Sequence, residues 1–359
     1  MRAIAAATAA LLVFPACAPG ARTPGSAPPA ARDTTCAPDF AAMESAVRGG
    51  YPGLPGMTEA RRAEFEAVTR GVREEARRAP DAAACMATLQ RWVTWFGDNH
   101  MQLGESRPAQ PATTAAPSAD PDLPSLSFAD DSTAVLRLPS FGRDYKRAVD
   151  SLVAAHRARL LATPLLVVDV RGNGGGWTAV YDSVLPFIYT NPIRVEGMDV
   201  YASPANAALT REMIASGRAP AAMLEQARAV LARMEANPGR FVTFAEDTEL
   251  RFDAVYPSPR AVALLVDRRC ASSCEQFILD ARQSRKVTVI GTGNTRGMLD
   301  YGNLRRVSLP SEQRRFFMPT ARSRRLPAHS LDRTGIAPAV LVPPGTDPLA
   351  FAIQHLRTR

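Results

Sequence analysis

Lysine is almost absent from this sequence of 359 residues. Only Lys146 and Lys286 occur, so arginine carries nearly all of the positive charge behind the formal net charge of +8. The basic residues are scattered, and no motif combines them with aromatic residues. This charge is therefore typical of a solvated surface, and we expect no nucleic-acid partner. Neither lysine is a good candidate for a catalytic base, since Lys146 lies on a helical face and Lys286 opens a strand.

Histidine and cysteine are also scarce, with four and five residues. No C-x-x-C pair occurs and no histidine lies near the cysteines, which argues against a metal site. The glycine loop Asn173–Gly176 lacks the Gly-Lys-Ser/Thr of a P-loop and the spacing of a dinucleotide fingerprint. We therefore expect no metal and no cofactor. The loop leaves a buried strand and exposes backbone N–H groups, which suits an anion or oxyanion.

Long apolar runs are missing, and the run Ile4–Phe14 is too short to span a membrane. With Arg2 before it and small residues after it, this run predicts a signal peptide at residues 1–17. Cys17 follows Ala16 as in a lipoprotein signal; the alternative is ordinary cleavage near Ala16 or Ala18. Residues 18–35 form a flexible tether rich in Pro, Ala and Gly. Both alternatives predict an exported protein, periplasmic or anchored through Cys17 to the outer membrane of a bacterium.

Four cysteines remain after Cys17, and an even number in an exported protein favours disulfides. Cys36 and Cys85 flank a helical segment, whereas Cys270 and Cys274 flank a pair of serines. The sequence leaves the pairing open. It also leaves open a thiol enzyme based on Cys274, because the start of a helix lowers the pKa of a thiol.

The chain divides into three regions after the tether. Residues 36–104 form a helical subdomain, in which Asp39 and Thr58 are expected to cap helices and apolar residues recur at three- and four-residue spacing. Residues 105–130 form a linker or loop rich in Pro and Ala. Residues 131–359 alternate strands with helices, and continuous apolar strands such as Val262–Val266 indicate an α/β sheet covered by helices. A helical insertion is expected at Asn206–Ala236.

One stretch, Cys270–Glu275, has the local pattern of a nucleophile turn. It follows an apolar strand and precedes a helix, so the N–H groups of the helix start can face a developing oxyanion. Serine is also a common helix cap, and Glu275 is assigned only that role. A serine nucleophile needs a base. His156 and His355 lie within helices, which leaves His100, in the turn Gly97–His100, and His329 as its rival.

Several separate motifs in residues 36–359 resemble the tail-specific, C-terminal processing and tricorn-type serine peptidases. Leu165–Gly176 resembles the family's strand followed by an Arg-Asn-Gly-Gly loop, and Cys270–Glu275 resembles its small-Ala-Ser-Ala-x-Glu turn. The segments Ile290–Gly297 and Gly335–Pro338 resemble its Gly-x-x-Thr-x-Gly and Gly-Ile-x-Pro motifs. No PDZ domain, which processing members often carry, is recognisable here.

The resemblance implies a catalytic triad. The nucleophile lies three residues before the glutamate, at Ser272. Processing members use a lysine just after Thr-x-Gly, where this chain has Met298. The tricorn-like branch uses a histidine in an Asp-x-His turn, which matches His100. Its acid lies three residues before the Gly-Ile-x-Pro glycine, at Asp332, where glutamate is more usual.

The resemblance further implies a crotonase/ClpP-like fold and acyl transfer to a peptide or unfolded protein. The backbone N–H of Ser273, with that of Gly175 or Gly176, is expected to bind the oxyanion. Retinoid-binding relatives of the same fold supply the alternative, a catalytically silent protein that binds a peptide or a lipid.

Overall fold

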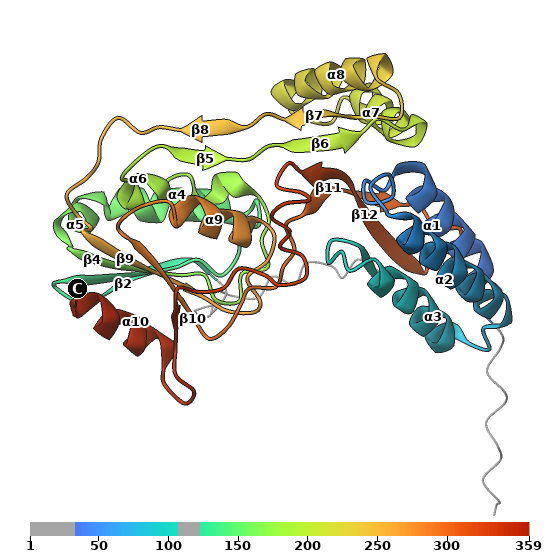
Figure 1. The fold of residues 1–359 in the computed structure, drawn as a ribbon. Helices are drawn as coiled ribbons and strands as arrows, with labels where there is room; N and C mark the ends of the chain where they lie inside the picture. The colour runs from blue at the N-terminus through green and yellow to red at the C-terminus, as the bar shows by residue number, and fades with distance from the viewer. Residues whose placement is uncertain (1–32, 107–122, 359) are drawn as a thin grey trace, which may run out of the picture.

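The computed structural model describes residues 33–106 and 123–358 (Figure 1). The predicted signal peptide at residues 1–17 and most of the predicted tether lie outside the described residues. The predicted α/β class is confirmed: a central sheet is covered by helices on both faces.

The central sheet has six strands in the order β13-β10-β9-β4-β3-β2. All neighbours are parallel except β2, which pairs antiparallel with β3 at the edge. The bounds are β2 Ser125–Asp130, β3 Thr133–Arg137, β4 Leu165–Asp169, β9 Ala261–Val266, β10 Val287–Gly291 and β13 Val340–Leu341. Every residue of β4 and β9 is buried, as expected of parallel strands covered on both faces.

Alternate residues of the central strands face different helices. Leu166 and Val168 pack in the larger apolar cluster, with α4 Tyr145–Ala155, α5 Arg157–Ala162, η1 Thr178–Tyr181, α6 Leu185–Ile188 and α9 Ser273–Ala281. Leu165 and Val167 pack in the smaller cluster, against α10 Pro348–Arg357. Figure 1 shows these two layers of helices on opposite sides of the sheet. This packing directs the carboxyl ends of β4 and β9 to one edge, where the candidate site lies.

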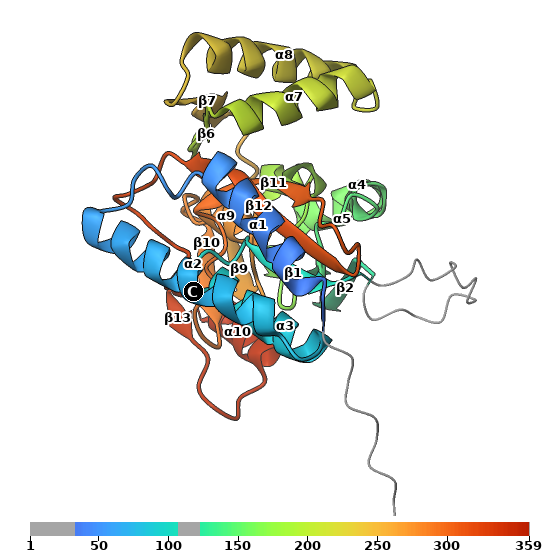
Figure 2. The same cartoon turned by 90° about the vertical axis from the view of Figure 1, so that its right-hand side faces the viewer.

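A second, antiparallel sheet joins distant parts of the chain in the order β1-β12-β6-β7, with β11 also paired to β12. Its strands are β1 Gln102–Glu105, β6 Met198–Tyr201, β7 Phe241–Ala245, β11 Tyr301–Val307 and β12 Arg314–Ser323; β5 Ile193–Val195 and β8 Thr248–Leu250 form a separate ribbon. The N-terminal helices α1 Cys36–Gly50, α2 Glu59–Arg78 and α3 Ala82–Trp95 lie against this sheet (Figure 2).

The N-terminal helices share their core with the C-terminal half of the chain. Phe316 and Met318 of β12 pack in the same apolar cluster as Phe40 and Trp92 of the helices. Asp39 accepts hydrogen bonds from Ser311 and from the buried Arg314. The expectation that Asp39 caps a helix is therefore wrong, because α1 begins at Cys36 and the carboxylate instead fixes the helix to β12. Thr58 caps α2 as expected, accepting from the N–H of Arg61.

Other boundaries differ from the expected ones. The end of the predicted linker, Ser125–Asp130, is strand β2, and Glu105 ends β1. The remaining part of that linker, residues 107–122, lies outside the described residues. The helical insertion is a hairpin of α7 Pro204–Ser216 and α8 Ala221–Ala236, separated where Gly217 adopts a left-handed conformation with φ 61°. Within the described residues, no helix has the length and apolar character needed to cross a bilayer.

Candidate active site

The candidate nucleophile lies at the turn between β9 and α9. Ser272 immediately precedes α9 and adopts φ 56° and ψ −120°. A non-glycine residue with positive φ is strained, and such strain often accompanies a functional role. The turn therefore does more than cap a helix, since an unstrained cap residue has an extended backbone.

The glycine loop that follows β4 packs directly against this turn. A side chain on Gly175, whose φ is +93°, would lie 2.5 Å from the carbonyl of Ala271 and 2.8 Å from Cβ of Ser272. Only glycine allows this approach. Asn173 stabilises the loop, because its Oδ1 accepts from the N–H of Gly175 and its Nδ2 donates to Leu138.

The two adjacent serines have different partners. Ser273 Oγ donates to the carbonyl of Gly176 at 2.7 Å, so this hydroxyl holds the glycine loop to the helix. Ser272 Oγ lies 3.1 Å from Nε2 of His100. The structure thus brings the predicted nucleophile and the predicted base within hydrogen-bond distance, across 172 residues of sequence.

His100 reaches the serine because its turn is fixed at both sides. Asp98 Oδ1 accepts from the N–H of His100 at 2.8 Å. The side chain of Asn99 donates to the carbonyls of Gly297 and Asp332, which attaches the turn to two loops in the C-terminal part of the chain. Burial lowers the pKa of His100 to about 4, and a polar contact with the backbone of Tyr301 partly offsets this. The imidazole is therefore neutral at pH 7 and able to accept a proton.

The other candidate bases lie elsewhere. His329 is exposed in a turn, His156 packs against Phe128, and His355 stacks on Phe351. The two lysines are also engaged away from the serine, Lys146 with Asp150 and Lys286 with the carbonyl of Tyr256. Among the four histidines, all within the described ranges, only His100 contacts the candidate nucleophile.

Asp332 lies next to the turn Gly97–His100, since its carbonyl accepts from Asn99, but its carboxylate makes no hydrogen bond to the imidazole of His100. Its Oδ1 accepts from the N–H groups of Leu299 and Asp300, each at 2.8 Å. Its Oδ2 has no hydrogen-bond partner among the described residues. The Nδ1 atom of His100 likewise has no hydrogen bond of normal geometry there. Burial raises the pKa of Asp332 to about 8, and the charges of Asp98 and Asp300 add to the effect. Burial likewise raises the pKa of Asp98 to about 7.

The predicted oxyanion donors lie in the glycine loop that packs against Ser272 and at the first residue of α9. The N–H of Gly175 is already bonded to Asn173. For the N–H groups of Ser273 and Gly176, the structure shows no hydrogen bond to any described residue. Among the predicted oxyanion donors, these two are therefore the N–H groups for which the described residues show no acceptor.

Glu275 is the residue whose importance sequence reasoning missed. Its fully buried carboxylate accepts from the backbone of Ser272 and from Thr295, at 3.1 and 2.5 Å, and from the N–H groups of Gly297 and Met298, both at 2.7 Å. It thereby joins the nucleophile turn to the loop that also carries the Asp332 contacts. The helix cap assigned from sequence is present but is only one of these four interactions.

Both cysteine pairs form disulfides, Cys36–Cys85 and Cys270–Cys274. The second one closes the turn that contains Ser272. The alternative of a thiol nucleophile at Cys274 is therefore wrong, since that sulfur is buried and bonded. No cluster of three or more His, Cys, Asp or Glu side chains in the described parts of the chain is arranged to hold a metal ion.

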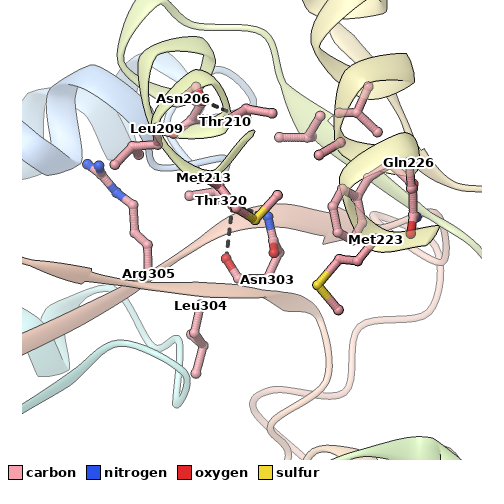
Figure 3. Close-up of a pocket in the computed structure, with 14 residues that line it drawn as sticks. Asn206, Leu209, Thr210, Met213, Met223, Gln226, Asn303, Leu304, Arg305 and Thr320 are labelled. Atoms are coloured by element: carbon pink, nitrogen blue, oxygen red, sulfur yellow. Dashed lines mark hydrogen bonds between the residues drawn. The ribbon is translucent and has the colours of Figure 1, made fainter. Parts of the chain in front are cut away.

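Two cavities lie in different parts of the molecule. One, of about 790 Å³, adjoins the nucleophile turn and is lined by Gly174, Ala271 and Met298 among others. The other, of about 340 Å³, lies between the α7–α8 hairpin and strands β11 and β12 (Figure 3). Met213 and Met223 of the hairpin line it, and no candidate catalytic residue does. Of these two cavities, only the first is lined by a candidate catalytic residue, Asp332.

Comparison with known proteins defines the class. The chain is a serine-type peptidase with an α/β fold, and residues 132–342 match the family model of Peptidase family S41. Because this match covers more than half of the sequence, the chain belongs to that family. No curated protein sequence matches significantly.

Solved structures show the same fold over nearly the whole chain. A putative peptidase from Parabacteroides merdae is 16% identical, with a TM-score of 0.57, and the alignment covers 90% of this chain and 97% of that one. Mature CPAF complexed with lactacystin is 10% identical, with a TM-score of 0.58 and coverage of 90% and 95%. At these identities the similarity concerns the fold alone.

Proposed function

We propose that this protein hydrolyses peptide bonds through an acyl-enzyme on Ser272. The observation that carries the proposal is the 3.1 Å distance from Ser272 Oγ to Nε2 of His100, at a strained turn between β9 and α9. Neutral His100 accepts the hydroxyl proton as Oγ attacks the peptide carbonyl, then donates it to the leaving amine. A water molecule then attacks the acyl-enzyme in the same way, with His100 again accepting the proton, and the acid product is released.

The remaining groups stabilise the charges that form. The N–H groups of Ser273 and Gly176 bind the oxyanion, and loss of one such donor costs about 3 kcal/mol in comparable hydrolases. Asp332 is the acid of the triad in this proposal. Among the described residues, neither its buried Oδ2 nor the buried Nδ1 of His100 has a hydrogen bond of normal geometry, and a bond between them would satisfy both atoms.

A fluorophosphonate probe tests this proposal directly. The wild-type protein is expected to be labelled and to cleave an unfolded protein such as casein. Ser272→Ala should lose both properties, whereas Ser273→Ala should still be labelled, because that hydroxyl bonds to Gly176. Failure of the wild type to react would refute the proposal and favour a protein that only binds peptides or lipids. Equal labelling of Ser272→Ala would also refute it, because another residue would then be the nucleophile.

We also propose that the protein is exported, with Cys17 as a lipid-anchor candidate. The two disulfides support export, because such bonds persist in oxidising compartments. Fractionation of cells that express the full chain, with wild type and Cys17→Ala compared for labelling by a palmitate analogue, tests both parts. A cytoplasmic location would overturn the first part, and equal lipid labelling would overturn the second.

A further inference from the structure

Three arginines from three separate loops line the cavity beside the nucleophile turn. Arg269 lies in the turn after β9, Arg296 in the loop after β10, and Arg333 directly after Asp332. Arg333 also lies over the histidine turn, since a side chain on Gly97 would be 3.7 Å from its Nε. Arg269 lies in the loop that carries Ser272, and Arg296 lies in the loop that contacts Glu275. Arg333 lies in the loop that carries Asp332.

These cations lack counter-ions. In the described part of the chain, none of the three guanidinium groups makes an ion pair or a hydrogen bond, whereas many of the other arginines do. Examples of paired arginines are Arg48, Arg73, Arg171, Arg211, Arg314 and Arg324. The cavity therefore presents three unneutralised positive charges from its exposed lining.

Acidic groups near the cavity do not cancel these charges. Its acidic lining residues are Asp98 and Asp332, both buried, and burial raises the pKa of each well above that of an ordinary carboxyl. Asp267, next to the Arg269 turn, already accepts from the backbone N–H groups of Gly172 and Arg269. Like charges gathered in a cleft concentrate anions there, and arginine matches the geometry of a carboxylate.

We propose that this cavity selects peptides that carry carboxylate groups close to the scissile bond, with Arg269, Arg296 and Arg333 as the residues that determine the selection. The inference rests on the proposed peptidase function and names its substrate class. Because Ala271 and Gly174 line the cavity next to Ser272, the bound carboxylate lies on one side of the bond that is cleaved. Aspartate or glutamate side chains and a free C-terminus both supply this group.

Matched peptides separate these two sources. One pair differs by Glu against Gln in a peptide with blocked ends, and another differs by a free against an amidated C-terminus. We expect the carboxylate member of at least one pair to have a KM about tenfold lower with similar kcat. Each single Arg→Gln change should weaken this preference about two- to fivefold, as typical exposed ion pairs do, and 0.5 M salt should reduce it. Arg268→Gln is the matched control, an exposed neighbour outside the cavity lining.

A binding measurement keeps the inference testable without turnover. Fluorescence anisotropy with Ser272→Ala should show tighter binding of the carboxylate peptides, lost when all three arginines are replaced by Gln. Equal binding of both members of each pair, or a preference that survives the triple change, would overturn the inference. Failure of the peptidase function has a different signature, since it appears as absence of fluorophosphonate labelling in the wild type.

Discussion

The carboxylate of Glu275 accepts a hydrogen bond from the backbone N–H of Ser272 at 3.1 Å, and so helps to hold the strained backbone of the proposed nucleophile. The same carboxylate accepts three more hydrogen bonds from the 295–298 loop. It is thus a positioning residue that acts through Ser272.

We predict that Glu275→Ala lowers the free energy of unfolding by about 3 kcal/mol or more, because it leaves several buried donors without an acceptor. Glu275→Gln should lose less stability, since it keeps the volume and one acceptor oxygen. Urea unfolding and kcat/KM are the measurements. Glu225→Ala, at an exposed position of α8, is the control, and a Glu275→Ala variant as stable as this control would contradict the prediction.

The contact between Gly175 and Ser272 leads to a second prediction. Gly175→Ala places a methyl group against Ala271 and Ser272 and imposes a strained φ, so kcat/KM should fall about 100-fold, as displacement of a reacting group by about 1 Å causes. Gly71→Ala, in α2 and outside the cavity lining, is the control, because nothing lies within 4 Å of its added methyl. Equal activity of the two variants would show that the close packing is unimportant.

The raised pKa of Asp332 predicts how activity depends on pH. A protonated carboxyl cannot stabilise an imidazolium, so kcat/KM should increase as Asp332 loses its proton around pH 8. Asp332→Asn should remove this alkaline increase and lower kcat about 10⁴-fold, as in other triads. A pH–rate profile of the two proteins between pH 6 and 10 tests this. Identical profiles would exclude Asp332 from the triad.

The buried carboxyl of Asp98 also predicts that the stability of the protein depends on pH. Burial raises the folded-state pKa of Asp98 to about 7, against about 4 in the unfolded chain. Between these values the folded state holds the proton that the unfolded state releases, so stability decreases as pH rises from about 4 to 7. Asp98→Asn should therefore be more stable relative to wild type at pH 8 than at pH 5. Denaturant unfolding of both proteins at both pH values is the measurement. If the difference in free energy of unfolding between them were the same at pH 5 and pH 8, the raised pKa of Asp98 would be refuted.

The two disulfides are expected to have different roles. Cys36 and Cys85 are separated by 49 residues, and the loop-closure model assigns such a bridge about 4 kcal/mol, against about 2 kcal/mol for Cys270–Cys274. Replacing the first pair by alanine should mainly lower the melting temperature. Replacing the second should mainly lower kcat, because it brackets Ser272. Thermal unfolding and activity of both double variants are the measurements, and the reverse pattern would contradict this expectation.

Local patterns were sufficient to predict the central strands and the turn that carries the nucleophile. The continuous apolar runs of β4 and β9 indicated buried parallel strands, and the resemblance of Cys270–Glu275 to the family's motif singled out Ser272 rather than Ser273. The strand predictions are confirmed because burial patterns depend on residues a few positions apart. The same limitation explains the error at Asp39, whose partners Ser311 and Arg314 lie more than 270 residues away.

Composition and spacing therefore predicted the class of fold and the export signal, and the family resemblance supplied the candidate catalytic residues. Tertiary structure alone placed His100 beside Ser272, gave Glu275 its role between two loops, joined each cysteine to its partner, and gathered three arginines at one cavity. Apart from the two disulfides, these relationships depend on how separate loops meet at the edge of the sheet. That meeting is governed by packing between distant segments, which no local spacing in the sequence encodes.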